Sequence, residues 1–151
     1  MRLTTFTDYT LRTLMYLGAN RDRLVRIQDI ADSHGISKNH LMKVVHQLGL
    51  AGIVETIRGR HGGLRLKLEP AQINLGRVVR ATETDFFMAE CFDQASDSCP
   101  LSGNCRLQYV LATATLAYLE ALDAQTLETL LGTPAQPAVS PLLFQRMAAA
   151  A

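Results

Sequence analysis

The feature that most restricts the fold is a pair of short strand-like runs, 53–57 and 64–68, separated by a glycine-rich basic hexapeptide. In the second run Leu64, Leu66 and Leu68 alternate with charged residues, which is typical of a strand with one buried face. The glycines of the hexapeptide allow the chain to turn tightly between the two runs. The sequence therefore predicts a hairpin with a basic tip.

Three helical patterns precede this hairpin. Apolar spacing predicts a first helix from Thr5 to Asn20, with Thr5 as its cap and Asp8 completing the capping box. A second helix is expected over 27–34, and a third begins after Ser37, a residue that caps helices well. The inward positions of the third helix are Leu41, Val44, Val45 and Leu48. Helix, helix, turn, helix and hairpin is the order of a winged helix-turn-helix.

The second half of the chain predicts further helices around a loop. One helix is expected from its cap Asn74 to near Thr84, and a second over about 105–122 is apolar on nearly every side. A chain of 151 residues has little left to cover such a helix, so we expect a symmetric homodimer through it. The expected fold class is mainly α, a winged helix-turn-helix with a two-stranded wing plus a long C-terminal dimerisation helix. The expected parts are 1–84 for DNA binding, 85–104 as a cysteine loop, 105–131 as the dimerisation helix and a short following helix, and 132–151 as a disordered tail.

Charge divides the chain into a basic and an acidic half. Residues 1–80 hold 13 Lys and Arg against 6 Asp and Glu, whereas residues 81–151 hold 2 against 8. The basic half suits a polyanion such as double-stranded DNA. The expected DNA contacts are Ser37, Lys38, Asn39, His40 and Lys43 at the start of the third helix and Arg58, Gly59, Arg60 and His61 at the wing tip. A solvated basic face on a protein-interaction module is the alternative.

Three cysteines, Cys91, Cys99 and Cys105, precede the long apolar helix. Their odd number, and a start without a signal segment, argue against a disulfide-stapled secreted protein. No apolar stretch is long enough for a bilayer, so we expect a cytoplasmic chain without a membrane partner. Tight C-x2-C pairs of structural zinc sites are missing. Metal or cluster binding, redox-active thiols and inert cysteines remain open at this point, and a cluster on three thiolates would leave one coordination position to another ligand.

Taken together, residues 1–9, the wing 58–64 and the three cysteines resemble the Rrf-type winged-helix regulators, in particular those that sense nitric oxide. The resemblance covers about residues 1–131. It implies a homodimeric bacterial repressor that holds an iron–sulfur cluster, [4Fe-4S] in preference to [2Fe-2S], on the three cysteines. It also implies that nitric oxide nitrosylates the cluster, which releases the operator DNA and derepresses detoxification genes.

The same resemblance implies a fourth ligand to the [4Fe-4S] form, an aspartate at the start of the first helix of the other subunit. The matching residue is Asp8, whose other role is that of a helix-cap carboxylate. One related regulator carries a histidine three residues after its last cysteine, where this chain has Gln108, which argues against a [2Fe-2S] site of that kind. The alternatives are a thiol redox switch and a sensor of iron–sulfur status. An enzyme is not expected, because no nucleophile elbow, phosphate loop or metal-hydrolase motif is present.

Overall fold

A computed structural model describes residues 2–93, 95, 97–101 and 104–132 of the chain. Its elements are α1 (Thr5–Ala19), α2 (Ile27–His34), α3 (Lys38–Leu50), β1 (Val54–Ile57), β2 (Gly63–Leu66), η1 (Pro70–Gln72), α4 (Leu75–Thr82), η2 (Glu90–Phe92), α5 (Arg106–Asp123) and α6 (Leu127–Leu131). The mainly helical winged helix-turn-helix expected from the sequence is confirmed. The expected tail falls almost entirely on residues 133–151, outside the described residues.

Local signals place the ends of the helices. Ser37 and Asn74 cap α3 and α4 as expected, each accepting a hydrogen bond from the backbone N–H three residues later. The expected cap of α1 is wrong by one residue. Thr4 and not Thr5 is the N-cap, because the Thr4 hydroxyl accepts a hydrogen bond of 3.2 Å from the N–H of Thr7. Asp8 therefore lies in the first turn of α1, but it does not form the expected capping box with Thr5.

The core lies where α1, α2 and α3 meet the base of the wing. All four expected inward positions of α3 are buried. Fully buried side chains from other elements include Leu14 of α1, Ile30 of α2 and Leu127 of α6. Three threonines of α1 are also buried, and two of them satisfy their hydroxyls on the carbonyl four residues back. The helix periodicity read from the sequence thus identifies the face of each helix that packs inward.

The wing is an antiparallel pair in which Val54 lies opposite Leu66 and Ile57 lies opposite Gly63. Both predicted strands are present and somewhat shorter than expected. Leu64 is buried while its neighbours are exposed or half-buried, as the alternation predicts. Reciprocal backbone hydrogen bonds between Val25 and Leu64, of 3.0 and 2.7 Å, attach the wing to the segment before α2. The wing is thereby fixed relative to the helices.

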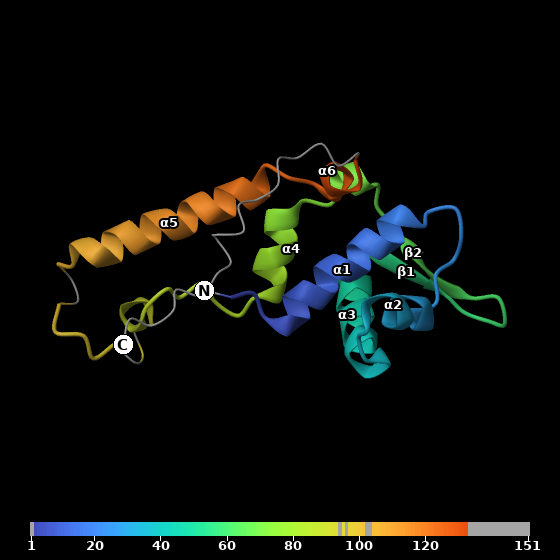
Figure 1. The fold of residues 1–151 in the computed structure, drawn as a ribbon, viewed down its shortest axis with the longest axis horizontal. Helices are drawn as coiled ribbons and strands as arrows, with labels where there is room; N and C mark the ends of the chain where they lie inside the picture. The colour runs from blue at the N-terminus through green and yellow to red at the C-terminus, as the bar shows by residue number, and fades with distance from the viewer. Residues whose placement is uncertain (1, 94, 96, 102–103, 133–151) are drawn as a thin grey trace, which may run out of the picture.

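In Figure 1, α5 runs along one side of the molecule, over α4, while α3 and α2 lie on the other side of α1. No residue of α5 is buried in the described chain. After α5 the chain turns back, and α6 packs on α1. The N–H of Leu127 donates to the carbonyl of Ile73 at 2.8 Å, which ties this return to the segment before α4. Among the described residues no helix is both long and apolar enough to cross a membrane.

Candidate nucleic-acid interface and cysteine loop

The N-terminal end of α3 presents a polar and basic surface. Ser37 caps the helix, and the N–H of His40 donates to its hydroxyl at 3.3 Å. The side chains of Lys38, Asn39, His40 and Lys43 are exposed, whereas the opposite face of the helix is buried. All five residues predicted at this end of α3 therefore lie together on one exposed surface, as the first turn of a recognition helix requires.

One contact of this surface was not predicted. The ring of Tyr9 on α1 lies 5.9 Å from the ring of His40, measured between centroids, with the planes tilted by 39°. This distance is typical of interacting rings. The start of α1 therefore supports the imidazole at the start of α3. No local sequence signal reports such a contact, because the two residues are brought together only by the packing of α1 on α3.

The wing tip carries the second predicted set of contacts. Arg58, Gly59, Arg60 and His61 are all exposed in the turn between β1 and β2. Gly59 has a φ of 114°, a conformation that other residues rarely adopt. At Gly62 a side chain would place its Cβ 2.1 Å from the carbonyl oxygen of Ile57. Both glycines are needed for this turn, and the turn is what projects the two arginines from the sheet.

The Lys and Arg side chains of these two surfaces have no acidic partner among the residues that the structure describes. In the described part of the chain Lys38, Lys43, Arg58 and Arg60 form no ion pair. The ion pairs of that part instead involve Arg12, Arg21, Arg23, Arg65 and Arg80. Exposed cations without an acidic partner can pair with the phosphates of a nucleic acid, whereas cations already in an ion pair contribute less to such binding. The charge on these surfaces is therefore available to a polyanion.

The three cysteines gather in the segment that joins α4 to α5. Cys91 lies in η2, Cys105 is the N-cap residue of α5, and Cys99 lies between them. All three are unbridged and half-buried. Burial raises the pKa of the Cys91 thiol above its ordinary value, and a backbone hydrogen bond partly opposes this rise. The nearby Cys99, Asp97 and Cys105 each raise the pKa by a smaller amount. Cys91 is thus the thiol that the other two cysteines influence electrostatically.

Hydrogen bonds fold this segment on itself. The side-chain amide of Gln108 donates to the carbonyl of Cys91 at 2.9 Å, which ties η2 to the first turn of α5. The hydroxyl of Ser98 donates to the carboxylate of Glu90 at 2.8 Å. Among the residues that the structure describes, no three Cys, His, Asp or Glu side chains are arranged to hold a metal ion. Three thiols nevertheless fit an iron–sulfur cluster as a donor set, with one ligand still to be supplied.

Asp8 forms an ion pair on its own helix. Its carboxylate accepts a hydrogen bond of 3.1 Å from the guanidinium of Arg12, one turn along α1, and both side chains are nearly half exposed. Within the described single chain, Asp8 and the cysteines do not form one group. The Asp8 carboxylate is partly exposed to solvent.

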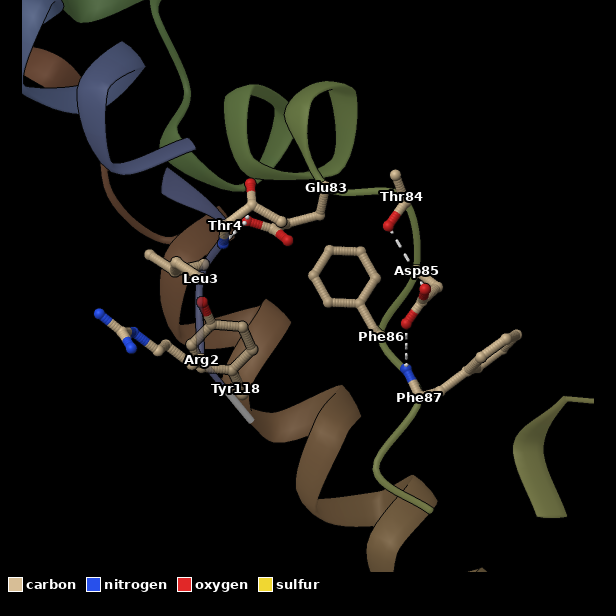
Figure 2. Close-up of a pocket in the computed structure, with 9 residues that line it drawn as sticks. All are labelled: Arg2, Leu3, Thr4, Glu83, Thr84, Asp85, Phe86, Phe87 and Tyr118. Carbon is tan, nitrogen blue, oxygen red and sulfur yellow. Dashed lines mark hydrogen bonds between the residues drawn. The ribbon is translucent and has the colours of Figure 1, made fainter. Parts of the chain in front are cut away.

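Figure 2 shows a connection between the start of α1 and the segment that leads to the cysteines. The N–H and the hydroxyl of Thr4 both donate to one carboxylate oxygen of Glu83, at 2.8 and 3.1 Å. Phe86 and Tyr118 of α5 lie beside this contact, around a cavity of about 210 Å³. Burial, and then the charge of Glu83, raise the pKa of Tyr118 above its ordinary value. No local sequence signal predicts this contact, because 79 residues separate its partners.

The fold and these two basic surfaces define a winged-helix DNA-binding protein. The chain belongs to the Rrf2 family of transcriptional regulators, since the family pattern, described as "Iron-dependent Transcriptional regulator", matches residues 3–133. It is similar to the HTH-type transcriptional regulator NsrR of Bacillus licheniformis, with 53% identity over 132 residues, 87% of this chain and 92% of the relative. The NsrR of Bacillus subtilis is 53% identical over 131 residues, 86% of this chain and 90% of the relative.

Solved structures agree on the fold. The oxidised form of Staphylococcus aureus CymR superposes with a TM-score of 0.71 at 22% identity, over 90% of this chain and all of that one. T. potens IscR superposes with a TM-score of 0.71 at 23% identity, over 95% of this chain and 96% of that one. Membership of the Rrf2 family and the similarity to the NsrR regulators make this chain a DNA-binding transcriptional regulator and not an enzyme.

Proposed function

We propose that this chain is a repressor whose α3 enters the major groove of double-stranded operator DNA while the wing tip contacts the backbone or the minor groove. The observation that carries this proposal is the set of exposed, unpaired cations at the start of α3 and at the wing tip. Asn39 and Lys38 have the groups to pair with adenine and guanine edges, and Arg60 suits a narrow minor groove. The proposed DNA-binding part is residues 1–84.

The signal, in this proposal, is nitric oxide, and the residues that hold its receptor are Cys91, Cys99 and Cys105. These residues would hold an iron–sulfur cluster, [4Fe-4S] in preference to [2Fe-2S], which would supply iron able to react with nitric oxide. The proposal is supported by the thiol donor set in segment 85–104, by the similarity to regulators named NsrR and by the family description as iron-dependent. Asp8 of the partner subunit is the proposed fourth ligand, for which it would have to leave Arg12.

The proposed assembly is a cytoplasmic homodimer through residues 105–131. α5 carries Leu107, Tyr109, Val110 and Leu116, each between 58% and 74% exposed. A helix that exposes so much apolar surface in a single chain is suited to pack against a second copy of the chain. In a two-fold symmetric dimer the same face of α5 would be buried on both subunits. A dimer is also what brings Asp8 of one subunit toward the cysteines of the other.

The test is anaerobic reconstitution of the full chain with iron and sulfide, followed by visible absorbance and native mass spectrometry with and without nitric oxide. Without nitric oxide we expect a coloured dimer whose mass includes a cluster. With nitric oxide we expect the cluster mass to be replaced by nitrosylated species, and the protein to release duplex DNA. Cys99→Ala should be colourless and still dimeric, whereas the neighbouring Ser98→Ala should keep the colour. A wild-type chain that stays colourless would refute the cluster, and a disulfide formed on oxidation would then favour the thiol switch.

A further inference from the structure

The N-terminal half of α3 exposes one apolar side chain among polar ones. Met42 is 46% exposed. Lys38 and Asn39 lie one turn before it on the same face, and His46 lies one turn after it, all of them exposed. The other apolar side chains of this stretch of α3 are buried, and Leu50, 70% exposed, lies about 12 Å further along the helix axis. Met42 is therefore outside the buried core and lies on the surface proposed to meet DNA, between Lys38 and Asn39 on one side and His46 on the other.

The major groove offers a specific match for such a side chain. Base edges present hydrogen-bond donors and acceptors there, and the C5-methyl group of thymine is the apolar group among them. Methionine is unbranched and flexible, so its side chain can adapt to a methyl group whose position depends on sequence. Met42 is also the fifth residue of α3, within the part of a recognition helix that reaches base edges.

We propose that Met42 is a specificity-determining residue that contacts thymine methyl groups in the operator. This inference rests on the proposed entry of α3 into the major groove. Asn39 and Lys38 would read donors and acceptors, and Met42 would select for thymine at a neighbouring position. Without the methyl group the same position would still allow base pairing and backbone contacts, so the contribution of Met42 can be isolated chemically.

The experiment replaces thymine by deoxyuracil, which pairs in the same way and lacks only the methyl group. The wild-type chain first selects binding sites from a pool of random duplexes, and each thymine of the selected duplex is then replaced in turn. For at least one thymine in each half-site we expect affinity to fall about three- to fivefold, the effect of one methyl group leaving an apolar contact. Met42→Ala should bind the unmodified duplex with an affinity lower by a similar factor. Replacing that thymine by deoxyuracil should not lower the affinity of this variant further.

Two control variants separate this inference from the proposed function. Leu50→Ala removes an exposed apolar side chain from the far end of α3 and should leave both affinities unchanged. Asn39→Ala should weaken binding but keep the sensitivity to deoxyuracil. The inference is overturned if the wild-type chain tolerates every replacement, or if Met42→Ala loses as much affinity on replacement as the wild type does. Failure to enrich any duplex would overturn the proposed function as well.

Discussion

Removing the side chain of Leu127 should destabilise the whole chain. Leu127 is fully buried on α6, and its backbone N–H is bonded to Ile73 beside the packing of α6 on α1. Leu127→Ala leaves that hydrogen bond intact and removes only apolar contacts. For a fully buried leucine the transfer and cavity contributions together amount to about 3 kcal/mol. In a chain of this size that loss corresponds to a fall in Tm of about 6–12 °C.

Thermal and urea unfolding followed by circular dichroism measure this effect. Both proteins must be compared at one concentration, because association makes Tm depend on it. The matched control is Leu130→Ala on the same helix, where the side chain is 38% exposed and the expected loss is below about 1 kcal/mol. Equal losses for the two variants would show that α6 is not packed on α1 as the structure has it.

Two further predictions concern charge. Arg60→Ala should weaken binding to duplex DNA and reduce the slope of log K against log salt concentration by about one. The control Arg65→Ala removes an arginine that is already paired with a glutamate, so it should change neither the affinity nor the slope. Fluorescence anisotropy across a salt series measures both slopes, and equal slopes for the two variants would contradict the prediction. Hydrogen bonding to Arg80 lowers the pKa of Asp123, so the stability from this pair is present at neutral pH and is lost as pH falls through the lowered pKa. Asp123→Asn should therefore be less stable than wild type in urea at pH 7 and equal to it in acid; a difference independent of pH would refute the assignment.

Much of the DNA-binding surface could be predicted because its signals are local. Ser37 caps α3, and the 3.6-residue period that follows decides which side chains of the helix face outward. This period places Leu41 on the buried face of the helix and Asn39 and Lys43 on the exposed face. Alternation in the second strand similarly identified Leu64 as its inward residue. Such signals need no knowledge of how the elements pack on one another.

The contacts that join the elements could not be predicted in this way. Thr4 and Thr5 are equally good caps by composition, and the choice of Thr4 accompanies its hydrogen bonds to Glu83, a residue far along the chain. The bond from Gln108 to the carbonyl of Cys91 likewise depends on how the cysteine segment returns to α5. Periodicity carries no information about either contact, since both are set by tertiary structure.

The two ends of α5 are held very differently, and this difference decides where a signal at the cysteines can act. The C-terminal end is fixed by the two hydrogen bonds between Arg80 and Asp123 and by the burial that follows on α6. The N-terminal end adjoins a segment whose three cysteines are half-buried, and just before this segment Glu83 contacts Thr4. Weakly packed segments rearrange at lower free energy than buried ones. If the cysteine segment changes, we therefore expect the start of α1 to respond. Thr4, the N-cap residue of α1, contacts Glu83 just before that segment, and Tyr9, the fifth residue of α1, supports His40 at the start of α3.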